Sequence, residues 1–421
     1  MTTSLEPVPE SSLPESSGPE PATKRSIGRI TLMVIAVVIG LYILIAQLLA
    51  VIPVHWTKPA LQWAPTQMAI LGIDIYIRDP LGSWNLVLAV VAVVAAILAW
   101  RARATRWARI VSVGTSVGLV LSIVAAIGLA AVAHTATGKW ILFAPSVPFL
   151  QAGDAPNETI TYATLDGKPI QADLYLPAKS NTPAPLVVSI HGGGFIGGSK
   201  RTNPFTTWLA GHGYAVMDVE YRLADKDHPR WNTADADVGC AITWAVANAS
   251  HYHWDMNRVA TMGDSAGGNL SINVAYKSNN GALQPTCGTA ADLPKIRAAV
   301  AEYPAVDLTD SGTDTAMGDQ LTPKYIGGSV AEYPDRYAAT DSAPQISPKS
   351  PPTLILQGGN DHLVLASRTA AFVQKLTDAG ITNRTIQFPF TDHGFGLVDL
   401  GTQAQAGRIA VLDWLERYDG S

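Results

Sequence analysis

Three long runs of uncharged, apolar residues dominate the first third of the chain. They occupy about residues 30–53, 82–100 and 110–133 and contain no Asp, Glu, Lys or Arg. Each run is long enough to cross the hydrocarbon core of a bilayer, which takes about 20 residues of α-helix. Trp84 and Trp100 lie near the two ends of the second run, where interfacial aromatic residues are expected. The pattern predicts a membrane domain of three transmembrane helices over residues 27–136.

A polar tail precedes the first run. Residues 1–26 are rich in Pro, Ser, Glu and Thr, so they bury too little apolar surface to offset the entropy of ordering, and we predict disorder. A cleaved signal peptide is the alternative explanation of the first run. The run is much longer than the apolar region of a usual signal peptide, and no A-x-A site follows it. We therefore expect a retained helix.

Lys and Arg residues predict the orientation of these helices. Three of them lie within residues 24–29 and four lie within residues 101–109. The segment between the first and second runs has only Lys58 and Arg78, opposed by nearby aspartates. Basic loops stay in the cytoplasm. We therefore expect a multi-pass protein of the cell membrane with a cytoplasmic N-terminus and everything beyond about residue 136 outside the cytoplasm.

Residues 67–77 leave one alternative topology open. This stretch is apolar, but it is short and contains Asp74. If it crossed the membrane as a fourth span, the C-terminal part of the chain would face the cytoplasm instead. Its length and its aspartate favour the three-span arrangement.

From about residue 150 the pattern changes to alternating strands and helices. Residues 158–177 contain two alternating stretches around Asp166-Gly167, which predicts a β-hairpin. Short β-branched runs then alternate with helical patterns as far as residues 405–418. Such alternation is typical of a mainly parallel sheet with helices on both faces, so residues 150–421 are predicted to be an α/β domain. In such sheets the loops after the strands build the site.

Three of these loops carry residues suited to nucleophilic catalysis. Ser265 lies in Gly-Asp-Ser-Ala-Gly-Gly (263–268), between a strand pattern and a helix pattern, which is the setting of a nucleophile on a sharp turn. A serine needs a base to take its proton and an acid to orient that base. His393 and Asp361 each follow a predicted strand. The sequence therefore predicts a catalytic triad of Ser265, His393 and Asp361.

Neighbouring residues offer weaker alternatives for the acid and the base. Asp392 is adjacent to His393, and its side chain should point elsewhere. His362 is adjacent to Asp361, and two adjacent residues cannot easily form the required pair, so we interpret it as a loop residue. His191-Gly192-Gly193-Gly194-Phe195 follows another predicted strand, and its glycines allow backbone N–H groups to turn toward an oxyanion.

The C-terminal domain resembles the α/β-hydrolases, and specifically the hormone-sensitive-lipase-like branch of esterases and lipases. The resemblance covers residues 155–418 and rests on five segments, namely HGGGF, EYRLA (220–224), GDSAGGN, SPPTLILQGGND and DHGF. It implies a serine carboxylester hydrolase that needs no cofactor. It also implies an oxyanion hole formed by the amides of Gly193, Gly194 and Ala266.

Two features depart from that family's pattern. The three N-terminal spans do not belong to it, and residues 225–229 read Asp-Lys-Asp-His-Pro where many relatives have Pro-Glu-His-Pro. The longer insertion at residues 307–345 is expected to border the acyl pocket. The expected partners are the bilayer and an ester substrate, such as a lipid or an acylated sugar. An acyltransferase or deacylase of the cell envelope with the same triad, and a non-catalytic binding module, remain as alternatives.

Charge and cysteine content limit the other function classes. The net charge is −5 and the only marked basic stretch is rich in Arg, so nucleic-acid binding is not expected. Cys240 and Cys287 have no CxxC spacing, so a cysteine-based zinc site is not expected. Outside the cytoplasm these two residues can form a disulfide. The alternative is that Cys240 is a small buried residue.

Overall fold

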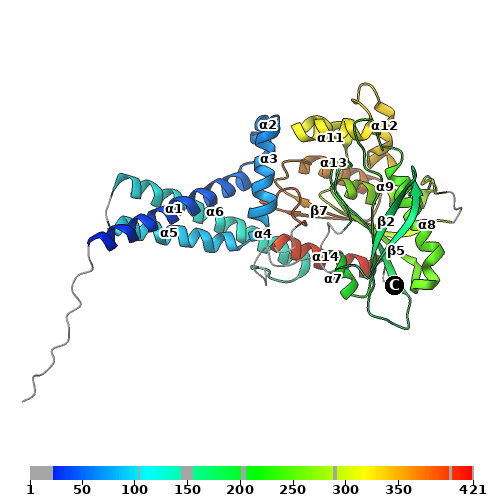
Figure 1. Cartoon of the computed structure of the whole chain (residues 1–421), viewed down its shortest axis with the longest axis horizontal. Coiled ribbons are helices and arrows are strands. Elements are labelled where there is room, and N and C mark those ends of the chain that lie inside the picture. The colour runs from blue at the N-terminus through cyan, green and yellow to red at the C-terminus, as the bar shows by residue number, and fades with distance from the viewer. Residues whose placement is uncertain are drawn as a thin grey trace, which may run out of the picture.

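The computed structural model describes residues 22–102, 105–143, 155–200, 205–287, 292–397 and 401–419. Most of the predicted N-terminal tail, Arg103 and residues 150–154 lie outside these ranges. An elongated helical bundle forms one end of the molecule and the α/β domain forms the other (Figure 1). A short helical segment lies between them.

The bundle consists of three long helices that match the three apolar runs. They are α1 (Ala22–Val51), α5 (Trp84–Ala102) and α6 (Arg106–Thr137). All three are long and apolar enough to cross a membrane. Small residues let them approach closely, because a Cβ on Gly40 would overlap Thr115 and one on Gly118 would reach Ile43. The outward positions are mostly Val, Ile and Leu, as a lipid-facing surface requires.

The segment between α1 and α5 folds against the α/β domain, and we call residues 54–81 the connecting segment. It contains α2 (Val54–Leu61), α3 (Ala64–Ile73), the single π-helical stretch η1 (Asp74–Arg78) and the short α4 (Asp79–Leu81). Gln67 and Asp74 are completely buried. The stretch considered above as a fourth span is therefore short and helical, and its polar side chains are buried against the α/β domain.

The α/β domain is built on one sheet of eight strands in the order β1-β2-β4-β3-β5-β6-β7-β8. The predicted hairpin is formed by β1 and β2, which pair antiparallel; β2 also pairs antiparallel with β4, and the other neighbours are parallel. This confirms the predicted, mainly parallel sheet. The strands are β1 (Glu158–Leu165), β2 (Lys168–Tyr175), β3 (Ala184–Ile190), β4 (Ala215–Val219), β5 (Trp254–Asp264), β6 (Ile296–Glu302), β7 (Thr353–Gly358) and β8 (Asn383–Phe388).

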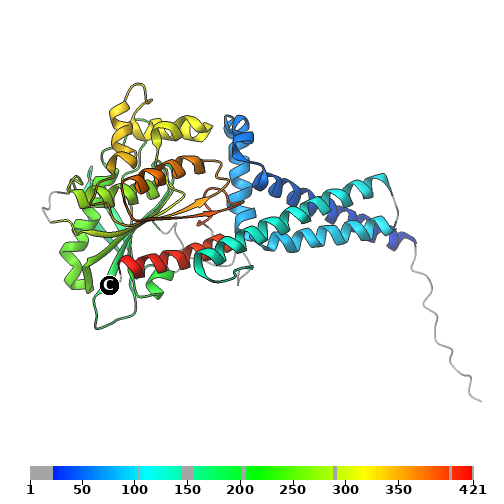
Figure 2. The same cartoon turned by 180° about the vertical axis from the view of Figure 1, so that it is seen from behind.

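Helices cover both faces of this sheet. One face packs against α8 (Ala234–Tyr252), α9 (Ala266–Asn280) and α13 (Ala366–Asp378). The other face packs against α7 (Phe205–Gly211), α14 (Thr402–Tyr418) and the end of α6, whose Leu129 and Ala133 join that core. The predicted insertion forms α10 (Leu308–Asp314), α11 (Ala316–Ile326), α12 (Pro334–Thr340) and the 3₁₀ turn η2 (Ala343–Gln345). The carboxyl ends of β7 and β8 point toward α3 (Figure 2).

The two cysteines of the chain lie next to each other in this domain. Cys240 is on α8 and Cys287 follows α9, with their Cα atoms 5.7 Å apart and their sulfur atoms paired as a disulfide. This Cα separation is within the usual range for disulfides. A bridge between residues 47 positions apart stabilises a fold by about 2–4 kcal/mol, chiefly by restricting the unfolded chain.

Candidate active site

Ser265 occupies the sharp turn between β5 and α9. Its φ of +51° and ψ of −114° are unusual for a residue with a side chain. The turn is possible only because its flanking glycines have no Cβ, since a Cβ on Gly263 would overlap the Gly267 carbonyl and one on Gly267 would overlap the Ile190 carbonyl. The Ser265 amide donates to the Glu302 carbonyl at 2.9 Å, which fixes the turn against the end of β6. The sequence therefore places this hydroxyl at the carboxyl edge of the sheet.

The structure brings His393 and Asp361 to this serine. The Ser265 hydroxyl and His393 Nε2 are 2.9 Å apart, and His393 Nδ1 is 2.9 Å from Asp361 Oδ2. The Asp361 carboxylate also accepts the amides of Leu363 and Val364 at 2.9 and 2.8 Å. These bonds hold the carboxylate in one orientation. The arrangement is that of a hydroxyl, a base and an acid that orients the base.

Burial and neighbouring carboxylates have opposite effects on the pKa of His393. The side chain is almost completely buried. Burial alone would lower the pKa of His393, but the charge and hydrogen bond of Asp361 outweigh it and raise the pKa above its usual value. Asp392 and Asp264 add to the rise. Tyr303 packs edge-on against the imidazole ring, with ring centroids 4.7 Å apart, and so limits its movement.

Asp392 and His362, the alternative acid and base, pair with each other and not with the residues of the candidate triad. Asp392 Oδ2 lies 2.6 Å from His362 Nδ1, and Asp392 Oδ1 accepts the amides of His362 and His393 at 2.8 and 2.6 Å. The Asp392 carboxylate therefore bonds the backbone of His393 rather than its ring. His362 is fully buried in this polar contact, so it is more than the simple loop residue that we expected.

The glycine loop after β3 packs directly against the nucleophile turn. Gly193 and Gly194 have φ values of +114° and +61°, which glycine adopts without strain. The Gly192 amide donates to Asp264 Oδ1 at 3.1 Å, which ties the loop to the residue before Ser265. Ala266 is the first residue of α9, so its amide lies at the helix N-terminus beside the same turn.

The insertion packs against this glycine loop. Leu321 of α11 lies against Gly194, and the ring of Tyr325 stacks on Phe195 with centroids 3.9 Å apart. The predicted insertion is therefore adjacent to the candidate site, and α3 of the connecting segment contacts α11.

The connecting segment also reaches the candidate site, which the sequence did not indicate. Gln67 Nε2 donates to the His362 carbonyl at 3.0 Å, and the Asp392 amide donates to Asp79 Oδ2 at 3.2 Å. A Cβ on Gly394, directly after the histidine, would come within 3.2 Å of the Ile75 side chain. These partners are roughly 300 positions apart in the chain. The only local signal was the presence of charged residues in an otherwise apolar segment.

We use the term ionic cluster for the five buried side chains at this contact, which are Asp74, Arg78, Asp79, His362 and Asp392. Asp74, His362 and Asp392 offer potential metal-ligand atoms within 4.8 Å of one another. Arg78 Nε, however, lies 2.9 Å from Asp74 Oδ1, so a guanidinium already supplies a positive charge there. A metal ion would have to share Asp74 with this guanidinium, and the residues do not favour a metal site.

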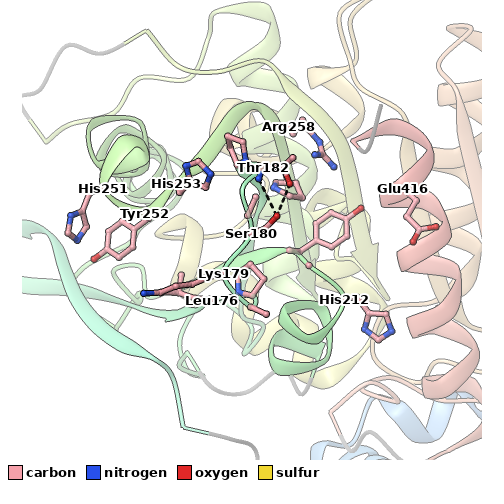
Figure 3. Close-up of a pocket in the computed structure, with 17 residues that line it drawn as sticks. Leu176, Lys179, Ser180, Thr182, His212, His251, Tyr252, His253, Arg258 and Glu416 are labelled. Carbon is pink, nitrogen blue, oxygen red and sulfur yellow. Dashed lines mark hydrogen bonds between the residues drawn. The ribbon is translucent and has the colours of Figure 1, made fainter.

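A cavity of about 730 Å³ lies at the other edge of the sheet. Its lining includes Ala184 at the start of β3 and His253 just before β5, together with Lys179, His212 and Arg258 (Figure 3). Ser265 follows the carboxyl end of β5. The cavity is therefore separated from the candidate triad by the length of the sheet and cannot hold its substrate.

Comparisons with known proteins concern the α/β domain. Residues 172–376, just under half of the chain, match the BD-FAE family model. The α/β domain is similar to esterases. Esterase LipC of Mycobacterium tuberculosis is 27% identical over 222 residues, covering 52% of this chain and 54% of that protein. The probable carboxylic ester hydrolase LipM of the same organism is 30% identical over 242 residues, covering 55% and 54%. The chain thus spans about half the length of these relatives.

Solved structures give the same result for the fold. Esterase LipW of Mycobacterium marinum is 25% identical with a TM-score of 0.50, covering 61% of this chain and 81% of that one. A bacterial heroin esterase is 25% identical with a TM-score of 0.52, covering 62% and 83%. Sequence and structure together show that the α/β domain is similar to esterases of the α/β-hydrolase fold. The family match leaves the three long helices outside it.

Replacement of Asp361 by Asn tests the electrostatic role of this carboxylate. We expect kcat/KM for an ester to fall by about 10⁴-fold, because the imidazole loses the partner that fixes its tautomer.

His393 must be neutral to accept a proton, so wild-type activity is lost as the pH falls through its raised pKa. Without the Asp361 charge, burial lowers that pKa and the acidic limb of the pH profile moves to lower pH. Asp378→Asn, on the exposed surface of α13, is the matched control. If Asp361→Asn left both kcat/KM and the acidic limb of the pH profile unchanged, this role of Asp361 would be contradicted.

Proposed function

We propose that the protein is a membrane-anchored serine carboxylesterase in which Ser265 is the nucleophile. The observation that carries the proposal is the continuous set of hydrogen bonds from the Ser265 hydroxyl through His393 to Asp361, with 2.9 Å at each contact. The similarity to esterases supports the same conclusion from the rest of the domain. No cofactor is needed for this chemistry.

The geometry suits a two-step acyl transfer to water. In the first step Ser265 Oγ attacks the ester carbonyl carbon while His393 Nε2 accepts the hydroxyl proton. The negative charge on the carbonyl oxygen is stabilised by the amides of Gly193, Gly194 and Ala266, which are the proposed oxyanion hole. His393 then donates its proton to the leaving alcohol. In the second step it accepts a proton from a water molecule whose oxygen attacks the acyl carbon. It then returns this proton to Ser265 Oγ as the acyl–serine bond breaks and the carboxylic acid is released.

The membrane part of the proposal rests on the three candidate spans. If the N-terminus and the basic loop predicted at residues 101–109 face the cytoplasm, the α/β domain lies outside it, next to the membrane surface. The pairing of Cys240 with Cys287 supports this location, since disulfides persist mainly in oxidising compartments. An ester of a membrane lipid or an acylated envelope sugar is a suitable substrate for an enzyme held at this place.

Replacement of Ser265 by Ala tests the proposed function. We expect kcat for short p-nitrophenyl esters to fall by about 10⁴–10⁶-fold, with the thermal unfolding transition unchanged. Ser180→Ala is the matched control, because Ser180 lies on an exposed loop at the opposite edge of the sheet. Equal turnover by wild type and Ser265→Ala would refute the proposal. Diversion of the acyl group to an added alcohol instead of water would assign the same triad to an acyltransferase.

A further inference from the structure

The ionic cluster joins the connecting segment to the loop that carries His393. Asp74, Arg78 and Asp79 come from η1 and the start of α4, whereas His362 and Asp392 follow β7 and β8. Each of the five side chains is at most 5% exposed. Charged groups buried to this degree are costly unless they are paired, so their contacts must be specific.

Hydrogen bonds run through the cluster from Arg78 to the backbone of His393. Arg78 Nη2 donates to Asp79 Oδ1 at 2.7 Å, and Asp79 Oδ2 accepts the Asp392 amide at 3.2 Å. The Asp392 carboxylate in turn accepts the His393 amide at 2.6 Å and lies 2.6 Å from His362 Nδ1. The guanidinium thus orients Asp79, and Asp79 with Asp392 fixes two consecutive peptide groups.

Arg78 is the residue on which the charge balance of the cluster depends. Burial raises the pKa of Asp74 well above its usual range and raises the pKa of Asp79 to about 7, and in both cases Arg78 opposes the rise. Although burial would raise it, the pKa of Asp392 is lowered by its contact with His362. Three carboxyl groups therefore face one guanidinium, and Lys58, the other basic side chain of the connecting segment, pairs with Asp314 outside the cluster.

We propose that Arg78 and Asp79 are positioning residues for His393, so that a segment between two membrane-spanning helices sets the geometry of the base. This inference rests on the proposed role of His393. The imidazole must stay within hydrogen-bonding reach of Ser265 Oγ, and a shift of about 1 Å in such a group costs about 100-fold in rate. The connecting segment then contributes to turnover without contact with the ester.

Kinetics of the full-length protein in detergent test this role. We expect Arg78→Gln and Asp79→Ala to lower kcat by about 10–100-fold while KM stays within about twofold, because the cluster acts on the base and not on the substrate. The conservative variants Arg78→Lys and Asp79→Asn retain a cation and an acceptor, and they should recover part of kcat. Lys58→Gln is the matched control. Lys58 also joins this segment to the α/β domain, through Asp314 at 2.7 Å, but it is half-exposed and outside the cluster.

The outcomes separate this inference from the proposed function. Full kcat in Arg78→Gln and Asp79→Ala, with Ser265→Ala inactive, would overturn the positioning role and leave the esterase intact. An equal loss in Lys58→Gln would overturn it too, because any loosening of the segment would then suffice. If thermal unfolding shows that all four cluster variants are unfolded, the cluster serves folding only. Activity that persists in Ser265→Ala would refute the esterase itself.

The outer face of the connecting segment carries an independent observation. In α3 and η1 the polar side chains Gln67, Asp74 and Arg78 are buried, whereas Met68 and Tyr76 are 63% and 62% exposed. Trp56 and Trp63 are also exposed. A helix on the surface of a water-soluble domain has the opposite arrangement, with its apolar side inward. The exposed apolar face is therefore suited to a nonaqueous environment.

The position of this face indicates what covers it. The connecting segment is continuous with α1 and α5, and α2 and α3 run across the end of the bundle (Figure 1). Trp140, Leu142 and Phe143, just after α6, are exposed at the same end of the bundle. Aromatic residues gather at the level of the lipid headgroups. Amphipathic helices that lie in this plane bury their apolar side in the membrane.

We infer that the exposed face formed by Met68 and Tyr76 lies in the headgroup region of the bilayer. The inference rests on the proposed membrane anchoring. It places α3 between lipid on one side and the loops of His362 and His393 on the other. The candidate site is then held directly at the membrane surface.

Spin-label accessibility tests this inference in protein reconstituted in phosphatidylcholine–phosphatidylglycerol vesicles. With the cysteine pair closed, a single introduced cysteine is labelled selectively. We expect the label of Met68→Cys to be relaxed more by oxygen, and less by a water-soluble nickel chelate, than the label of Ser180→Cys. Val38→Cys, on the exposed face of α1, is the reference for the hydrocarbon core.

Each result has one interpretation. A Met68 label that behaves like the Ser180 label would overturn the lipid contact. A label inaccessible to both reagents would also overturn it, because another protein or a second copy of the chain would then cover the face. A Val38 label exposed to the nickel chelate would refute the membrane anchoring itself.

Discussion

The hydrogen bond between the Ser265 hydroxyl and His393 Nε2 is the interaction on which the proposed chemistry depends. A serine hydroxyl is a poor nucleophile until a base accepts its proton. Here the two groups come from turns 128 positions apart, and the parallel sheet brings them to the same edge. The strained turn of Ser265, the buried carboxylate of Asp361 and the edge-on ring of Tyr303 all restrict this one contact.

The structure also shows that the long apolar helices and the α/β domain share buried surface. Leu129 and Ala133 of α6 belong to the core beneath the sheet, and Arg384 of β8 donates to the Ala136 carbonyl at 2.7 Å. The connecting segment buries an arginine and two aspartates against the loops after β7 and β8. Burial of charge is expensive, so such an interface is specific and rigid rather than a flexible tether. The helical bundle and the connecting segment are thus packed as structural parts of the α/β domain.

The sequence was sufficient to predict the sheet and the three residues of the candidate triad. Strands and helices are local patterns, and a nucleophile turn needs glycines at fixed positions such as Gly263 and Gly267. The three apolar helices could be predicted because a long apolar run is also a local pattern. However, α6 continues beyond the expected span and packs on the sheet. The catalytic roles, the oxyanion hole and the membrane orientation stay predictions, because neither the geometry nor the relatives test them.

The contacts of the connecting segment could not be predicted from the sequence. Asp74, Arg78 and Asp79 were interpreted only as charges of a loop, since nothing local indicates that their partners are His362 and Asp392. His362 and Asp392 were considered as alternatives to the triad residues because they are adjacent to Asp361 and His393 in the sequence. In the structure they pair with each other. Pairings over such distances depend on the packing of the bundle on the sheet. Local periodicity carries no information about that packing.

Labelling of the full-length protein in membranes with a fluorophosphonate, followed by mass spectrometry of its peptides, tests the central claim most directly. The reagent reacts with a serine only when a neighbouring base activates its hydroxyl. The account predicts one adduct, on Ser265, which is lost in His393→Ala and retained in Lys58→Gln. No adduct at Ser265, or an adduct that forms equally well in His393→Ala, would contradict it.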